Sequence, residues 1–72
     1  MAAPPPPVRC QIIVRGVLSD TLLTAFPSLR AEAQGGVTVL EGELVDQSAL
    51  FGVVGQVEAL GLELVEIRRL KP

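Results

Sequence analysis

Residues 45–62 read VDQSALFGVVGQVEALGL, and this stretch has the start signal, the apolar stripe and the stop signal of one helix. Asp46 can accept hydrogen bonds from the free N–H groups of the first turn, and its charge suits that end of the helix dipole. Gly61 can adopt the left-handed conformation that ends a helix, which would return Leu62 onto Val57. One face of this helix is apolar and is expected to cover a sheet; it carries Ala49, Leu50, Val53, Val54, Val57 and Leu60.

Four stretches around the helix have the composition of β-strands. Residues 9–15 are rich in β-branched side chains, and residues 29–34 alternate strictly between two faces. Gly35-Gly36 offers the positive φ angles of a two-residue hairpin, so residues 37–44 should return antiparallel. The alternation of residues 63–69 is imperfect and indicates a bulge near Glu66. A short helix, capped by Ser19 or Asp20, is predicted to run through Phe26 before Pro27.

The hairpin predicts the register of its two strands. On one side Gln34 should face Val37, Glu32 should face Val39 and Arg30 should face Glu41. On the other side the expected pairs are Ala33–Thr38, Ala31–Leu40 and Leu29–Gly42. We expect the helices to cover this second side, where small residues would let the long helix approach the sheet closely.

The elements follow one another in the order βαββαβ. This order predicts an α+β, ferredoxin-like fold: an antiparallel four-stranded sheet with spatial order 4-1-3-2 and two helices on one face. Residues 8–70 would form this single domain. Residues 1–7 include four consecutive prolines and are predicted to be a disordered tail.

Composition excludes several classes of protein. Of the 72 residues, 49% are hydrophobic, which is too many for a disordered chain. Charges or turns interrupt every apolar run well before the roughly 20 residues of a membrane span. The net charge of −2 disfavours nucleic-acid and anionic-membrane surfaces. A single cysteine and no visible signal peptide favour the cytoplasm.

A resemblance adds a family label. The pattern Asp46-Gln47-x-Ala49-Leu50-x-Gly52, followed by Leu60-Gly61-Leu62-x-Leu64, resembles a family of small, uncharacterised actinobacterial proteins, with Leu40-x-Gly42 as a weaker match. The resemblance implies a ferredoxin-like fold and supplies no activity. Members of that family often carry histidine at the position of Phe51.

The side chains needed for most catalytic sites are missing. Without histidine, and with one cysteine, the chain can form neither a protein-only zinc site nor a serine–histidine or cysteine–histidine nucleophile pair. Cys10 is predicted to be a core residue, and Glu41 to pair across strands with Arg30. The two aromatic residues, Phe26 and Phe51, do not fall on the central strands where an RNA-recognition domain stacks bases. We therefore expect no enzymatic activity, no cofactor and no nucleic acid.

Two surfaces are candidates for protein contacts. The outer face of the sheet, away from the helices, would carry an apolar patch formed by Ile13, Val37, Val39, Val65 and Ile67. The outward side of the long helix is the second candidate, and it carries Phe51, Gly52, Gly55 and Ala59. Each helical glycine costs about 1 kcal/mol relative to alanine, which suggests close approach of another backbone.

These observations predict a non-enzymatic interaction or assembly module that forms a homodimer, with a further protein partner left open. Monomers seldom expose a contiguous apolar patch of several hundred Å². The alternative is a small-molecule sensor of the amino-acid-binding ACT type, which binds ligands near the loop after the first strand. That family's Asp-x-Pro-Gly loop is missing from residues 15–20.

Overall fold

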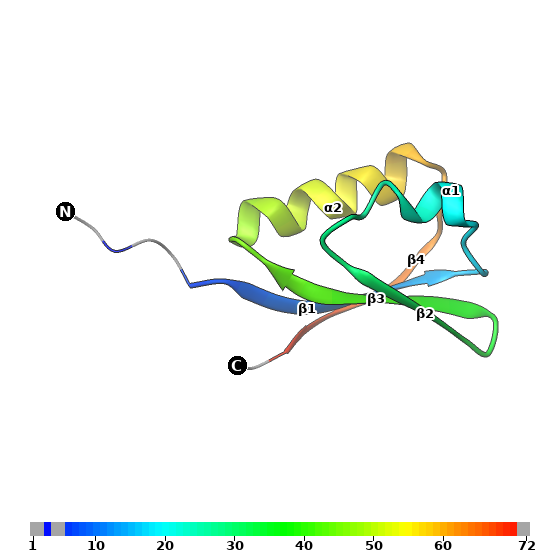
Figure 1. The fold of residues 1–72 in the computed structure, drawn as a ribbon, viewed down its shortest axis with the longest axis horizontal. Helices are drawn as coiled ribbons and strands as arrows, with labels where there is room; N and C mark the ends of the chain where they lie inside the picture. Colours follow the sequence, from blue (N-terminus) through cyan, green and yellow to red (C-terminus); the bar gives the residue numbers. More distant parts are fainter. Residues whose placement is uncertain (1–2, 4–5, 71–72) are drawn as a thin grey trace.

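The structure is a computed structural model that describes residue 3 and residues 6–70. Its elements are β1 (Val8–Arg15), α1 (Asp20–Leu23), β2 (Arg30–Gln34), β3 (Val37–Leu44), α2 (Gln47–Ala59) and β4 (Leu64–Leu70). The strands form one sheet, and both helices lie on the same face of it (Figure 1). The predicted α+β class, with four antiparallel strands and two helices, is confirmed. The disorder predicted for residues 1–7 falls mainly on residues outside the described part.

The sheet has the strand order β2-β3-β1-β4, which is β4-β1-β3-β2 when counted from the other edge. β1 lies in the interior of the sheet, where Ile12 pairs with Leu40 on one side and with Ile67 on the other. The composition of β1 suits this place because Cys10, Ile12 and Val14 fill the core beneath the helices. β2 and β4 form the two edges.

The long helix begins and ends where the sequence predicts. The Asp46 carboxylate accepts a hydrogen bond from the Ala49 N–H at 2.9 Å, so Asp46 is the N-cap of α2. At the other end Gly61 has a φ of 73°. The Leu62 N–H donates to the Val57 carbonyl and the Gly61 N–H to the Glu58 carbonyl, both at 3.0 Å. These two bonds form a Schellman motif, which returns the chain toward the sheet.

The core lies between α2 and the two interior strands. Leu50 and Val57 are the buried residues of α2, and Ala49 and Val53 pack beside them. Val54 is half-buried, whereas Leu60 is 37% exposed, so its assignment to the buried stripe was wrong. The cause is that Leu60 is the C-cap residue of α2, so its backbone has left the regular helix and its side chain does not continue the buried stripe. The loop residue Leu18 and the Phe26 side chain complete the core.

The hairpin between β2 and β3 has the predicted register. Gly35 and Gly36 have φ angles of 54° and 87°, and Gln34 pairs with Val37, Glu32 with Val39 and Arg30 with Glu41. The expected cover over β2 is absent from the described residues, since Ala31 and Ala33 are exposed. α1 has only one turn, so it is too short to shield this edge of the sheet.

The residues at the two ends of α1 explain why this helix is short. Ser19 caps it by accepting from the Leu22 N–H at 3.2 Å. After Leu23 the chain tightens into turns in which the Ala25 N–H donates to Leu22 and the Phe26 N–H to Leu23. Pro27 disfavours helical backbone at Phe26. The predicted extension through Phe26 is therefore wrong, although the Phe26 side chain still reaches the core.

Gly42 allows another segment to approach the sheet closely, but this segment is not the long helix that the sequence analysis expected. A Cβ atom there would lie 2.7 Å from the Ser28 backbone oxygen and 2.9 Å from Leu29 Cδ2. The loop between α1 and β2 thus crosses Gly42, and the long helix does not. The expected Leu29–Gly42 pair lies just outside the ladder, which starts at Arg30–Glu41.

β4 has the expected irregularity. Its register with β1 shifts between Ile13 and Val14, because Glu66 pairs with Ile13 while Leu64 pairs with Val14. Val65 is the extra residue, one position before the predicted site of the bulge. This shift decides which face of the sheet each later residue of β4 occupies.

Candidate interaction surfaces

Three of the residues predicted for the outer face lie there together. Ile13 pairs directly with Val39, and Val37 lies two residues before Val39 on β3. All three side chains are half-buried although no layer of the described chain lies over this face. Polar neighbours account for this, since Ile13 has Glu66 beside it, Val39 has Glu32, and Val37 has Arg15. The exposed apolar area of the outer face is therefore small.

The placement of Ile67 on the outer face is wrong. Ile67 pairs with Ile12, whose side chain is fully buried under the helices, so Ile67 lies on the helix face. The bulge at Val65 is the reason, because one extra residue inverts the alternation of every position after it. Val65 itself is 47% exposed at the bulge, next to Ile13 in the ladder.

A cluster of charges and amides covers the rest of the outer face. Glu41 accepts a hydrogen bond from Gln11 Nε2 at 2.8 Å and lies 3.3 Å from Arg9 Nη2. Arg30 Nη2 lies 4.0 Å from the same carboxylate. The hydrogen bond from Gln11, together with the two arginine charges, lowers the pKa of Glu41 below its usual value. The predicted cross-strand pairing of Glu41 and Arg30 is confirmed.

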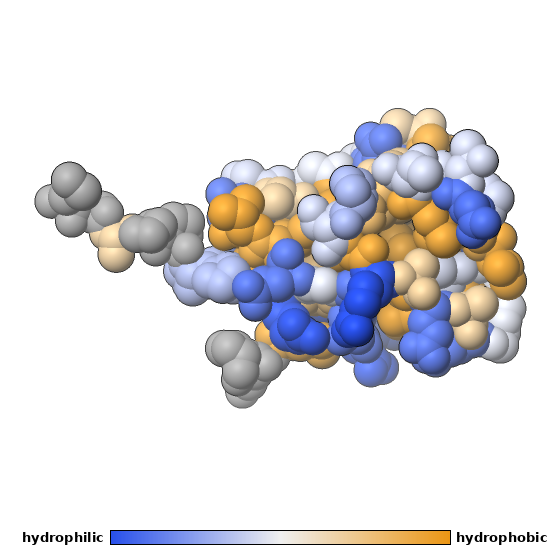
Figure 2. Space-filling model, in the orientation of Figure 1, coloured by the Kyte–Doolittle hydropathy of each residue, from blue (hydrophilic) through white to orange (hydrophobic). Residues whose placement is uncertain are grey.

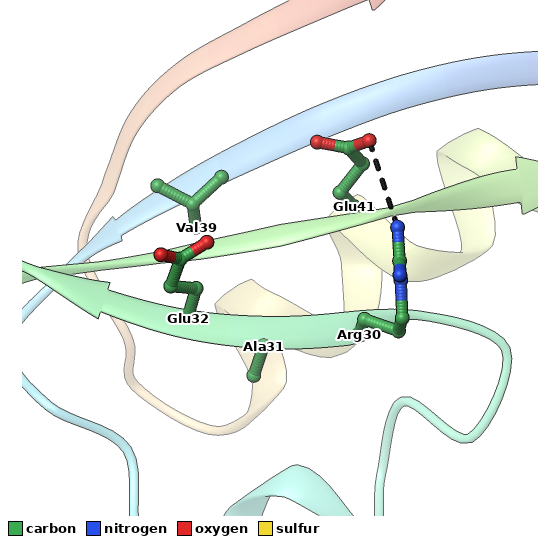
Figure 3. A pocket seen from close by; sticks show the side chains of 5 residues that line it. All are labelled: Arg30, Ala31, Glu32, Val39 and Glu41. Carbon is green, nitrogen blue, oxygen red and sulfur yellow. Dashed lines mark ion pairs between the residues drawn. The ribbon is translucent and has the colours of Figure 1, made fainter.

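A shallow depression of about 180 Å³ lies beside this cluster and is lined by Arg30, Ala31, Glu32, Val39 and Glu41. Figure 3 shows the Arg30, Glu32, Val39 and Glu41 side chains on one face of the hairpin and Ala31 on the other. Figure 2 shows further hydrophilic residues along this side of the sheet. A general acid would need a raised pKa, whereas that of Glu41 is lowered. The depression has the properties of a solvated ion-pair surface.

The second predicted surface is exposed in full. Phe51 is 63% exposed, and Gly52, Gly55 and Ala59 are also exposed. A Cβ atom added at Gly52 or Gly55 would meet no atom within 4 Å. The orientation of this side of α2 was predicted correctly. Nothing within the described residues requires glycine at either position.

Thr38 on β3 binds the loop after β1 by hydrogen bonds, and the sequence analysis did not predict this role. Thr38 is 2% exposed, and its hydroxyl accepts from the Leu18 N–H at 3.2 Å and donates to the Gly16 carbonyl oxygen at 2.7 Å. The Gly16 N–H also donates to Gly36 at 2.7 Å. An ACT-type sensor would use this loop to bind its ligand, and the Leu18 N–H there is already bonded. A threonine among the buried positions of a strand was the available signal.

Other chemistry has little support among residues 3 and 6–70. Cys10 is a fully buried free thiol, and burial raises its pKa, so it is the core residue that the sequence predicts. No three potential metal ligands gather in this part of the chain. Neither of its helices has the length and apolarity of a membrane-spanning helix.

β4 exposes several large apolar side chains, and the sequence analysis did not identify this strand as a separate candidate surface. Leu64 is 37% exposed, Val65 47% and Ile67 38%. Leu64 and Ile67 pair with the buried residues Val14 and Ile12, so both lie on the helix face near the free edge of the sheet. The imperfect alternation of residues 63–69 was the signal, but it did not reveal that α2 leaves this edge partly uncovered.

Comparison with known proteins places the chain in a family. The searches found no similar protein among curated sequences and no similar solved structure. One family matches residues 9–68, which span the sheet from β1 to β4 and both helices. This match covers most of the chain, which therefore belongs to the family described as a domain of unknown function (DUF8691).

Proposed function

We propose that this domain is a non-enzymatic interaction module that assembles into a homodimer. The observation that supports it is the exposure of Leu64, Val65 and Ile67 along an edge strand. Unpaired backbone groups at a sheet edge bind other strands, and charges and bulges usually oppose this. β4 has a bulge at Val65 and three charged residues, yet it leaves its large apolar side chains exposed. An edge that combines such groups with large apolar side chains favours association.

Burial of the exposed apolar side chains of β4 would stabilise the dimer. Removing such area from water stabilises a complex by about 25 cal/mol per Å². Association entropy offsets part of this gain, so a modest affinity is expected. The outer-face residues Ile13, Val37 and Val39 have less to contribute because their polar neighbours already cover them. We therefore place the contact at β4 rather than on the outer face.

The proposed absence of catalysis has its own support. The Glu41 carboxylate is already bound by two arginines and Gln11, and its pKa is lowered, which opposes its use as a general acid. The Cys10 thiol is buried and has a raised pKa, which opposes its use as a nucleophile. A single cysteine cannot form a disulfide within the chain, which supports the cytoplasm as the proposed compartment.

We also propose that the domain has the ferredoxin-like fold. The element order βαββαβ, the interior position of β1 and the helices on one face support a ferredoxin-like arrangement. The actinobacterial origin that we propose for the family is supported by the resemblance of residues 46–64 alone.

The test is the mass of the protein in solution, measured by sedimentation equilibrium across the micromolar range. A dimer is expected for the wild type and for Val39→Lys, which adds a charge to the outer face. Ile67→Lys should give a folded monomer, since it places a charge on the β4 edge; circular dichroism checks its folding. A wild-type chain that stays monomeric at the highest concentration contradicts the proposal, and a metabolite-induced thermal shift of such a monomer would favour the sensor alternative.

A further inference from the structure

The backbone of β4 has a defined set of groups at its free edge. The Arg15 N–H donates to Glu63 on the β4 side, and the Gly16 N–H donates to Gly36 on the β3 side. Because the groups of an antiparallel strand point alternately to its two neighbours, Ile13 and Gln11 also bond toward β4. Their partners are Glu66 and Arg68.

Ile67 lies between Glu66 and Arg68 along β4, so its backbone groups point to the opposite side of the strand. Its N–H and C=O therefore point away from β1, as do those of Arg69, toward an edge that has no neighbouring strand among the described residues. The side chain of Ile67 is at the same time 38% exposed on the helix face. One position thus presents both a hydrogen-bonding backbone and an apolar side chain to solvent.

We propose that β4 pairs antiparallel with β4 of a second copy, with Ile67 on the two-fold axis. This pairing rests on the self-association proposed above. The two Ile67 residues would exchange both of their free backbone hydrogen bonds. Val65 of each copy would lie opposite Arg69 of the other, and Glu66 opposite Arg68. A symmetric dimer uses the same patch on both subunits, and a strand paired with itself around one residue meets that condition.

The charges of β4 select this register. In the proposed pairing each Glu66 carboxylate faces the Arg68 guanidinium of the other copy, in addition to its own ion pair with Arg68. The neighbouring symmetric register on one side puts Glu66 against Glu66, and the one on the other side puts Arg68 against Arg68. Like charges directly opposite each other destabilise a sheet, so of these three registers the one around Ile67 is the one compatible with both residues.

The helix face favours the same register. The two Ile67 side chains would meet there, next to the buried Ile12 of each copy. The bulge at Val65 limits the pairing at one end, since the extra residue ends the regular ladder. The contact is therefore short, which agrees with a modest affinity.

The other edge of the sheet is a weaker candidate. On β2 the register around Ala31 would set Arg30 opposite Glu32, so its charges also permit self-pairing. Its helix face offers only Ala31 and Ala33, however, and these small side chains have far less apolar area to remove from water. Arg30 is in addition paired with Glu41 of its own chain.

The proposed dimer would have one continuous eight-stranded sheet, because each sheet contributes four strands. The outer faces of both copies, with Ile13, Val37 and Val39, would lie on the same side. The four helices would lie on the other. Pairing at β4 therefore leaves the outer faces of both copies unoccupied.

Cysteine cross-linking tests the geometry directly. Ile67→Cys should form a disulfide-linked dimer on mild oxidation with copper phenanthroline. Residues in a hydrogen-bonded antiparallel pair have Cα atoms about 5.5 Å apart, which is within the reach of a disulfide. The wild-type chain is the first control, because its Cys10 is fully buried.

Arg69→Cys is the matched control, and it is compared with Ile67→Cys in a Cys10→Ala background, because Arg69 lies directly opposite Cys10 and a new thiol there could pair with it. Arg69 lies on the same face of the same strand and is also exposed, but it would face Val65 of the other copy. The two introduced thiols would be about four residues apart along the strands, roughly 13 Å, and should not link. Ala31→Cys probes the β2 edge in the same way.

The outcomes separate this inference from the proposed function. Efficient linking of Ile67→Cys, without linking of Arg69→Cys, supports the register. Linking of Ala31→Cys instead, equal linking of all variants, or a wild-type dimer that Ile67→Cys does not link overturns the register while leaving self-association in place. A monomeric wild type rejects both.

A charge reversal provides an independent readout. Glu66→Arg places arginines opposite each other, so the dissociation constant of the dimer should rise at least about tenfold. Combining Glu66→Arg with Arg68→Glu restores opposite charges in the same register and should return the constant close to the wild-type value. A double variant as weak as the single variant overturns the proposed register.

Discussion

The Thr38 hydroxyl donates a hydrogen bond to the Gly16 carbonyl oxygen at 2.7 Å, across the junction between β3 and the loop that follows β1. The Thr38 hydroxyl oxygen in turn accepts from the Leu18 N–H at 3.2 Å. One buried side chain thus satisfies two backbone groups of the loop. It holds Leu18, which is 8% exposed, in the core.

Thr38→Val should lower the free energy of unfolding by about 1–3 kcal/mol, because it leaves two backbone groups without a partner in an almost identical volume. Thr38→Ser retains the hydroxyl and should lose less. Urea unfolding measures both variants. Equal losses would mean that the Thr38 methyl group, rather than its hydroxyl, supports the loop.

Gly42→Ala should destabilise the domain by about 1–3 kcal/mol, since the added Cβ would lie 2.7 Å from the Ser28 backbone oxygen and the loop would have to move. Thermal unfolding gives the change in stability. If Gly42→Ala were as stable as the wild type, the loop between α1 and β2 would not cross β3 at this distance.

Gly52→Ala and Gly55→Ala should each stabilise the domain by about 1 kcal/mol, because both positions are exposed in the interior of α2 and a Cβ there meets no atom within 4 Å. The dimer mass should not change. Loss of the dimer in the stabilised Gly52→Ala or Gly55→Ala variant would move the contact to the outward side of α2, which Phe51 and Ala59 flank.

Asp46→Ala should cost about 0.5–2 kcal/mol, because the Ala49 N–H would lose the carboxylate that caps α2. Asp46→Asn keeps an acceptor oxygen and should be nearly neutral. Chemical denaturation compares the two variants. A loss of dimer in Asp46→Asn at unchanged stability would show that the charge has a role beyond capping.

Acid stability should depend on Glu41. The hydrogen bond from Gln11 and the charges of Arg9 and Arg30 lower its pKa in the folded state. The stabilisation is therefore complete above the ordinary glutamate pKa of about 4.3 and is lost as the pH falls through the lower, folded-state value.

Glu41→Gln should consequently make the decline of stability in acid shallower, as measured by denaturant unfolding at a series of pH values. Gln11→Ala removes the hydrogen bond but keeps the carboxylate, so an intermediate slope is expected. A Glu41→Gln curve parallel to that of the wild type would contradict this role.

Local signals in the sequence determined most of the fold. The Asp46 cap, the Gly61 stop and the Gly35-Gly36 turn each act within a few residues, so their positions could be predicted without knowledge of the rest of the chain. The hairpin register followed directly, because a two-residue turn leaves one way to align Gln34 with Val37. The place of Cys10 in the core followed from the two-residue period of a strand rich in β-branched residues, which puts Cys10 on one face with Ile12 and Val14.

Tertiary structure decided what lies next to what. The bulge at Val65 moved Ile67 from the outer face to the helix face, and a one-residue shift of this kind depends on how β4 aligns with β1. The single turn of α1 left Ala31 and Ala33 exposed, and the loop at Ser28 took the place beside Gly42 that the long helix was expected to fill. The Thr38 hydrogen bonds likewise join segments that are distant in sequence. The exposure of the β4 edge also depends on where α2 packs on the sheet. Sequence periodicity reports which face of an element is apolar, but the neighbour that covers this face is set by the packing of the whole chain.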